Sequence, residues 1–271
     1  MVNRLWGMVW AIVILSGMAA TAHHLRNTVH NAFFLRSAGV SQEARSNLQE
    51  TLDRQTRDLG DLAYEMGQSA TLEETGFQEK AVRLLRDAPV YSAIAFLNES
   101  FRRQWGFPFT SRRLTQGTNL VNPSEEWTAA HRSVSTGEPA ASGLVDLMEG
   151  GRGILLYAPV HYGGQWTGVL EGSVLIARVA LDLISPTVGR DFYYTIIDER
   201  QGREIYASPS PGVKNVSPAY DSYFSLPVAD RTWWILLHPQ APPPTLAIVV
   251  GALCAEGLLG FLIYYLWRKR K

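Results

Sequence analysis

The chain has 271 residues, with 25 lysine and arginine residues against 25 aspartate and glutamate residues. That length allows one large or two small domains with a buried core. A net charge of zero excludes a general nucleic-acid binder, which needs a basic surface. The single cysteine excludes a disulfide framework and a cysteine-rich zinc site. Charged residues make up only 18% of the chain, and apolar segments at its two ends explain the deficit.

The first element in chain order is an uncharged apolar segment at residues 5–22. About twenty apolar residues in a helix cross the roughly 30 Å hydrocarbon layer of a membrane. The segment 1–22 is therefore expected to be a transmembrane helix that acts as a retained signal anchor. Ala20-Thr21-Ala22 also fits the cleavage site of a secretory signal peptide, so removal of the segment is the alternative.

The second apolar segment, residues 245–267, follows three prolines and precedes the basic tail Arg268–Lys271. Because basic flanks stay in the cytoplasm, the segment 242–271 predicts a second span in the inner (cytoplasmic) membrane. Both termini are then cytoplasmic, and the main domain is periplasmic or extracellular. Glu256 lies near the middle of this span, where an acid costs about 2.5–3.5 kcal/mol.

Small residues surround Glu256 at helical spacing, which suits close helix contact inside a bilayer. The alternative is a protonated Glu256 that has no partner. We expect packing against other membrane proteins by Ala247, Gly251, Ala252, Ala255, Glu256 and Gly260.

Residues 23–88 have the pattern of a helical stalk. Apolar residues recur at helical spacing from Leu48 to Met66, which predicts a helix over residues 41–69. The same spacing suits either packing on its own domain or pairing with the stalk of a second copy. A second helix is expected over residues 75–87.

After Pro89 the pattern changes to strands, beginning with residues 90–97 and 101–107. Asn122 is expected to cap a helix that Gly137 ends, because Pro123 suits a first turn. Antiparallel hairpins with helices to one side predict an α+β fold. The remaining expected elements are strands at residues 141–148, 153–162, 165–175, 192–198, 203–207, 222–228 and 232–238, and a short helix at 177–184.

The stretch from Ala93 to Ala177 resembles the CHASE family of extracytoplasmic sensor domains. The resemblance rests on AFLNESFRRQWGFP, on EEWTAAHRSVSTGEPAASGLVDL, and on GGRGILLYAPVHYGGQWTGVLEGSVL. It implies a stalk followed by two PAS-like units, here residues 89–184 (distal) and 185–241 (proximal). In that family the distal unit holds a small-molecule pocket.

Family members usually join the second span to a kinase or cyclase; with only four residues after Trp267 in this sequence, we expect no output domain in the same chain. We therefore expect a sensor subunit that acts on a partner protein through its membrane spans. The alternative is a non-catalytic accessory or scaffold subunit of a larger respiratory, photosynthetic or transport complex. A homodimer through the stalk is a further expectation.

Side chains with polar ends or flat aromatic rings are typical of small-molecule pockets. For each aromatic residue, a place in the hydrophobic core is the alternative. The sequence has no recognisable catalytic motif, so we expect neither an enzyme, a cofactor nor a metal site. The candidate ligand-binding residues are Asn98, Trp127, His131, Asp146, Arg152, Tyr157 and Trp166.

Overall fold

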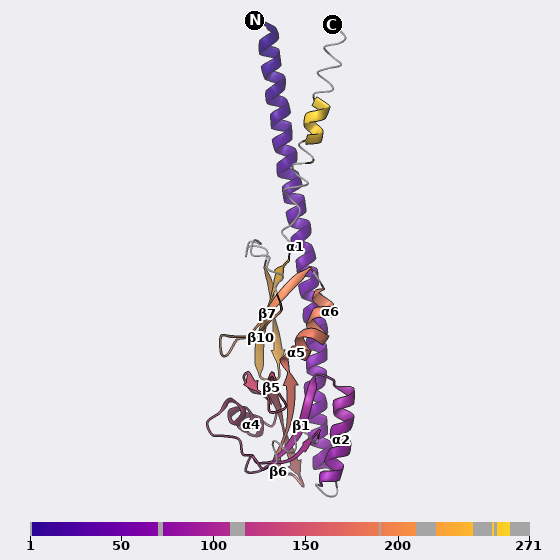
Figure 1. Cartoon of the computed structure of the whole chain (residues 1–271), viewed down its shortest axis with the longest axis vertical. Coiled ribbons are helices and arrows are strands. Elements are labelled where there is room, and N and C mark those ends of the chain that lie inside the picture. Colours follow the sequence, from indigo (N-terminus) through magenta and orange to yellow (C-terminus); the bar gives the residue numbers. More distant parts are fainter. Residues whose placement is uncertain are drawn as a thin grey trace.

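Two antiparallel sheets lie beside one long helix in a computed structural model of the chain (Figure 1). The arrangement is α+β, as the predicted hairpins indicate. The six-stranded sheet lies farther from the N-terminal end of the long helix and is called the distal sheet; the four-stranded one is the proximal sheet (Figure 1). The structure describes residues 2–69, 73–108, 117–189, 191–209, 221–240, 251 and 254–260.

The expectation of two transmembrane helices is corrected by the structure. Within the described residues, no helix combines the length and the apolar character needed to cross a membrane. The side chains of the first helix are described from Ser16 onward. Of the second segment, the structure describes residue 251 and residues 254–260.

The residues expected to pack inside a membrane lie in that second segment. Gly251 and Ala255 are exposed, and Glu256 and Gly260 are partly buried. Their role in helix packing stays a prediction. Ala247, Ala252 and the basic tail lie outside the described residues.

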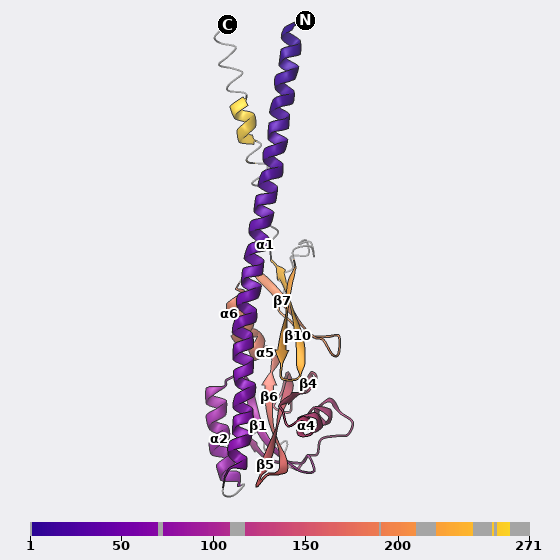
Figure 2. The same cartoon turned by 180° about the vertical axis from the view of Figure 1, so that it is seen from behind.

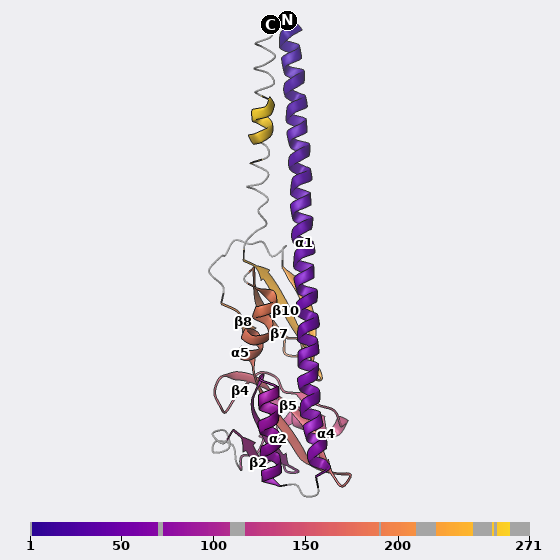
Figure 3. The same ribbon diagram turned by 90° about the vertical axis from the view of Figure 1, so that its right-hand side faces the viewer.

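A single helix, α1 (Val2–Gly67), takes the place of the separate span and stalk expected from the sequence. A row of its apolar side chains from Ala44 to Met66, including Leu48 and Leu59, is buried in the core shared with both sheets. Helix α2 (Glu74–Asp87) lies beside α1 (Figure 3). Glu65 of α1 joins the two helices, because Lys80 and Arg83 bind its carboxylate at 2.8 and 2.7 Å.

The distal sheet has the strand order β2-β1-β6-β5-β3, with β4 paired to β5. The expected strand at 141–148 is instead two short strands, which residues 142–144 connect. The strands are β1 (Tyr91–Asn98), β2 (Arg103–Phe107), β3 (Ala140–Ala141), β4 (Val145–Asp146), β5 (Arg152–Tyr162) and β6 (Gln165–Leu175).

Both faces of the distal sheet are covered, α1 and α2 packing on one and α4 (Glu125–Thr136) on the other (Figure 2). Side chains of a strand alternate between faces, so Phe96 joins the α1 core while Ala95 and Leu97 join the α4 core. Gly172 faces α1, where an added Cβ would lie 2.6 Å from the Tyr91 ring. The position of the Tyr91 ring between β6 and α1 therefore requires glycine here.

Helix α4 begins two residues later than the sequence predicts. Ser124, rather than Asn122, is the cap, and its Oγ accepts a hydrogen bond from the Trp127 amide at 3.0 Å. Both residue types cap helices well, and the later start places Glu125 at the first helical position. The expected end is confirmed, because Gly137 adopts a left-handed conformation with φ 76°.

The chain passes from β6 to the proximal sheet through three consecutive helical segments: α5 (Ile176–Arg178), a π-helical segment (Val179–Ile184) and α6 (Ser185–Val188). The proximal sheet has the order β8-β7-β10-β9. Its strands are β7 (Phe192–Asp198), β8 (Arg203–Ala207), β9 (Ser222–Val228) and β10 (Arg231–Pro239). One face of this sheet packs against α1.

Candidate ligand-binding site

A small polar cavity lies on the α4 face of the distal sheet. Its floor is formed by β1, β2, β5 and β6, and the chain from β4 to β5 covers its edge. The cavity measures about 20 Å³, which is room for about one water molecule. Its polar lining consists of Arg103, Glu126, Asp146, Glu149, Glu171 and Ser173.

A buried ion pair forms the base of this cavity. Strand β1 separates β2 from β6, and the guanidinium of Arg103 reaches across it to the carboxylate of Glu171. Arg103 Nε and Nη2 donate to the two carboxylate oxygens at 3.0 and 2.8 Å. Both side chains are about 5% exposed, so the pair is held away from solvent and its two-pronged geometry fixes both groups.

Tyr157 completes the base from the neighbouring strand β5. Its hydroxyl donates to Glu171 Oε2 at 2.9 Å. Burial and the charge of Glu171 raise the pKa of the Tyr157 phenol well above its usual value. Tyr157 therefore stays protonated and acts as a hydrogen-bond donor to Glu171.

Glu126 of α4 faces the same cavity from the opposite side. Burial raises the pKa of its carboxyl, and although the Arg103 charge lowers it, the Glu171 charge raises it again. Among the described residues the Glu126 carboxylate has no hydrogen-bond partner, unlike Glu171. It is the cavity's available acceptor.

The edge of the cavity is a tight turn between β4 and β5. Leu147 closes the turn, because its amide donates to the Gly151 carbonyl at 2.8 Å and its carbonyl accepts from Gly150 at 3.0 Å. Glu149 is held by Ser92, whose hydroxyl donates to its Oε1 at 2.8 Å. This edge is secured to the sheet by the Ser92–Glu149 contact, by the pairing of β4 with β5 and by the buried Leu147 side chain.

Two of the candidate residues predicted from the sequence lie at this site. Asp146 lines the cavity and pairs with the exposed Arg152 at 4.0 Å. Tyr157 lies beneath it, in contact with Glu171. Ligand contact by either residue stays a prediction.

The other candidates lie elsewhere on the distal unit. The Asn98 side chain accepts from the amides of Ser100 and Arg102, both at 3.1 Å, and so shapes the β1–β2 turn. Trp127 and His131 stack on each other on α4, with ring centroids 4.9 Å apart.

Trp166, another candidate, packs near Phe101, with ring centroids 5.7 Å apart, and donates to the Gly168 carbonyl at 2.8 Å. In the described part of the chain, none of Asn98, Trp127, His131, Arg152 and Trp166 lines the cavity.

Sequence reasoning missed Arg103, Glu126 and Glu171. One signal was present: Glu171 is the single charge within the apolar strand sequence VLEGSVL, and a charge in a buried strand requires a partner. Within the described residues, no group of three or more His, Cys, Asp or Glu side chains is placed to hold a metal ion.

Comparison with known proteins places this fold among sensor domains. The chain resembles the extracellular ligand-binding receptor of Desulfohalobium retbaense at 14% identity and a TM-score of 0.63; the match covers 74% of this chain and 40% of that one. It also resembles the ligand-binding domain of the Pseudomonas aeruginosa amino acid chemoreceptor PctC in complex with GABA, at 14% identity and a TM-score of 0.53. That match covers 73% of this chain and 96% of the domain.

A third similar structure is the ligand-binding domain of the Pseudomonas fluorescens chemoreceptor CtaA in complex with L-serine. Its identity is 11% and its TM-score 0.54, and the match covers 77% of this chain and 97% of the domain. A search of curated proteins gives no match. The model of the CHASE domain matches residues 69–204, which include α2, α4, the distal sheet and the first strands of the proximal sheet. Because this match covers half of its length, the chain belongs to the CHASE domain family.

Proposed function

We propose that this chain is an extracytoplasmic sensor that binds a small polar ligand in the distal cavity. The observation that carries the proposal is a cavity whose base is a fully paired Arg103–Glu171 group and whose opposite wall carries the free carboxylate of Glu126. A fixed polar base with one unsatisfied acceptor is what a site for an oriented polar ligand needs.

The charge of the cavity favours a ligand with an amine or another strong hydrogen-bond donor. Arg103 is already paired with Glu171, and the lining also carries the carboxyl groups of Glu126, Asp146 and Glu149, so acidic groups outnumber basic ones there. The similar domains of PctC and CtaA are described with GABA and L-serine, both small and amine-bearing. Small amino acids and amines are therefore the first class to test.

The present cavity is too small for such a molecule, so binding requires the turn from Leu147 to Gly151 to move outward. Loop rearrangement on binding is common in regulatory proteins. Helix α1 contacts both sheets and extends beyond them, which supports transmission of the change to a partner protein (Figure 1). Membership of a sensor family supports a non-catalytic role.

A thermal denaturation screen of the full chain tests the proposal. The probes are γ-aminobutyrate and the L-amino acids, because a ligand that binds the native state raises the unfolding temperature. We expect at least one probe to raise it for the wild type and for Glu138→Gln, an exposed control just after α4. Glu126→Gln should reduce the shift, because it removes a charged acceptor. An unchanged unfolding temperature with every probe, or an equal shift in Glu126→Gln, contradicts the proposal.

A further inference from the structure

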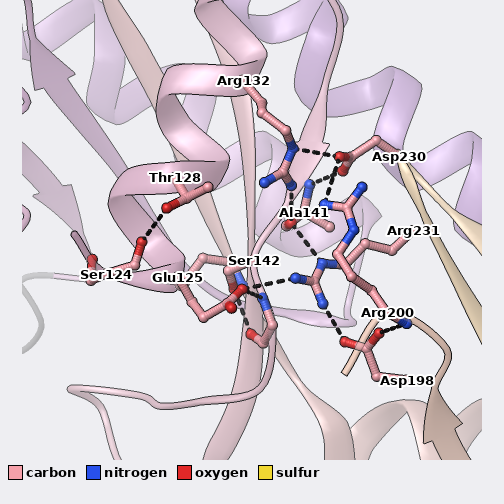
Figure 4. A network of polar contacts seen from close by, with 12 residues as sticks. Ser124, Glu125, Thr128, Arg132, Ala141, Ser142, Asp198, Arg200, Asp230 and Arg231 are labelled. Carbon is pink, nitrogen blue, oxygen red and sulfur yellow. Dashed lines mark hydrogen bonds and ion pairs between the residues drawn. The ribbon is translucent and has the colours of Figure 1, made fainter. Parts of the chain in front are cut away.

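A second polar cluster lies between α4 and the β9–β10 turn of the proximal sheet (Figure 4). Its centre is Arg231, whose side chain is 1% exposed. Arg231 Nη2 donates to Glu125 Oε2 of α4 at 2.8 Å, its Nε donates to the Ala141 carbonyl at 3.1 Å, and its Nη1 pairs with the buried Asp198. One side chain of the proximal sheet thus contacts α4 and β3 together.

The neighbouring residue Asp230 makes a parallel set of contacts. Its Oδ1 accepts from the Ala141 amide at 2.7 Å, and its Oδ2 accepts from Arg132 Nε of α4 at 2.7 Å. Arg132 also donates to the Ala141 carbonyl at 2.8 Å, and Arg200 lies 3.7 Å from Asp230. The turn therefore holds α4 at two points along its length.

The cluster is electrically complete. Three guanidinium groups (Arg132, Arg200 and Arg231) meet three carboxylates (Glu125, Asp198 and Asp230), so no external ion is needed to balance it. Buried charges that are matched and hydrogen-bonded resist separation, because removing one partner leaves the other unpaired.

Helix α4 joins this cluster to the distal cavity through adjacent residues. Glu125 points to Arg231, whereas Glu126 lines the cavity. Successive residues of a helix are about 100° apart, so the first turn of α4 faces both the polar cluster and the distal cavity. Any shift of the Asp230–Arg231 turn therefore moves the wall of the cavity.

We infer that the Asp230–Arg231 turn of the proximal sheet is a positioning element for the distal site. It fixes α4, and with it the Glu126 carboxylate, at the distance from Arg103 and Glu171 that a ligand requires. The role in binding rests on the proposed function. Coupling of this kind is reciprocal: ligand in the cavity also changes the strength of the contact between the two sheets.

Hydrogen exchange of the full chain, without ligand, tests the inference directly. We expect Arg231→Met to accelerate exchange of the α4 amides and of the 146–151 turn by about tenfold, because local opening no longer breaks charged hydrogen bonds. Arg231→Lys, which keeps the charge, should restore part of the protection. The matched control is Arg36→Met, which removes the exposed ion pair with Asp191 and should change neither segment.

Helix α2, which does not contact the cluster, serves as the internal reference. Equal acceleration in α2 and α4 means general loss of stability, and unchanged α4 exchange means no positioning; either overturns the inference. If Arg231→Met does not fold, Glu125→Ala, at a half-exposed residue, tests the same contact. If no probe binds the wild type, the proposed function is wrong, but hydrogen exchange without ligand still tests whether the turn positions α4. If a probe binds, its affinity should fall in Arg231→Met and Glu125→Ala and stay unchanged in Arg36→Met.

Discussion

Arg103 and Glu171 form the polar base of the distal cavity. Both side chains lie in the sheet, away from solvent. Moving a single charge out of water is costly, and pairing of the two charges offsets that cost. Burial lowers the pKa of the Arg103 guanidinium, but the charge and hydrogen bonds of Glu171 raise it above its usual value. Arg103 therefore stays charged, and its two hydrogen bonds to Glu171 give the cavity a fixed polar base.

Removing one member of this pair should lower the free energy of unfolding more than replacing both members. Arg103→Met or Glu171→Leu alone should lower the free energy of unfolding by about 3–5 kcal/mol, because one buried charge remains unpaired. The double variant should recover most of that loss, as measured by urea denaturation. Arg54→Ala, which removes the exposed pair with Glu50, is the control and should change stability by less than about 0.5 kcal/mol. A double variant that is as unstable as the sum of the singles would refute this account.

Asp230 links stability to pH. Burial raises the pKa of its carboxyl, but hydrogen bonds from Arg132 and the Ala141 amide, with the charges of Arg132 and Arg200, bring it below its usual value. A depressed folded pKa contributes stability above the unfolded pKa, which is near 3.9, and loses it as pH falls through the folded pKa.

The stability difference between the wild type and Asp230→Asn should therefore be largest near neutral pH and should shrink below about pH 4. Chemical denaturation across this pH range measures it. A difference that grows on acidification contradicts the direction of the pKa shift.

At the scale of elements, α4 depends on its Ser124 cap, which satisfies an amide of the first turn. Ser124→Ala should destabilise the chain by about 1 kcal/mol, and Ser124→Asp, which retains an acceptor, should not. Circular dichroism during thermal unfolding provides the measurement. Equal unfolding temperatures for Ser124→Ala and the wild type would show that the cap is dispensable.

Local patterns explain which elements the sequence could predict. The hairpin of β5 and β6 follows from apolar strands around Gly163-Gly164, and the end of α4 follows from Gly137. The start of α4 could not be predicted from local sequence, because Asn122 and Ser124 are both good caps and Pro123 between them is compatible with either one. A tertiary contact decides between them: with Ser124 as cap, Glu125 reaches Arg231.

The binding site was less predictable because it depends on strand order. Arg103 and Glu171 are 68 residues apart, and they meet only because β1 lies between β2 and β6. Candidate residues chosen for their chemistry, such as Asn98 and Trp166, instead stabilise turns and local packing. The residue types in the sequence predicted a polar site. Which residues form it depends on the order of the strands in the sheet.

At the scale of the whole molecule, three connections join the two sheets. Helix α1 packs on both, the helical segments from α5 to α6 continue directly from β6, and the Asp230–Arg231 turn holds α4. Arg178 of α5 also donates to the Pro89 carbonyl at 3.0 Å, at the start of β1. A change in the distal cavity therefore has continuous packed routes to the proximal sheet and to α1.

Calorimetric titration of the full chain tests the central claim most directly. The titrant is the amine or amino acid that gives the largest thermal shift, applied to the wild type, Glu126→Gln and Glu138→Gln. The account predicts one site per chain, an affinity about tenfold or more weaker in Glu126→Gln because a charged hydrogen bond is lost, and no change in Glu138→Gln. Equal affinity in all three proteins would contradict ligand binding in the distal cavity.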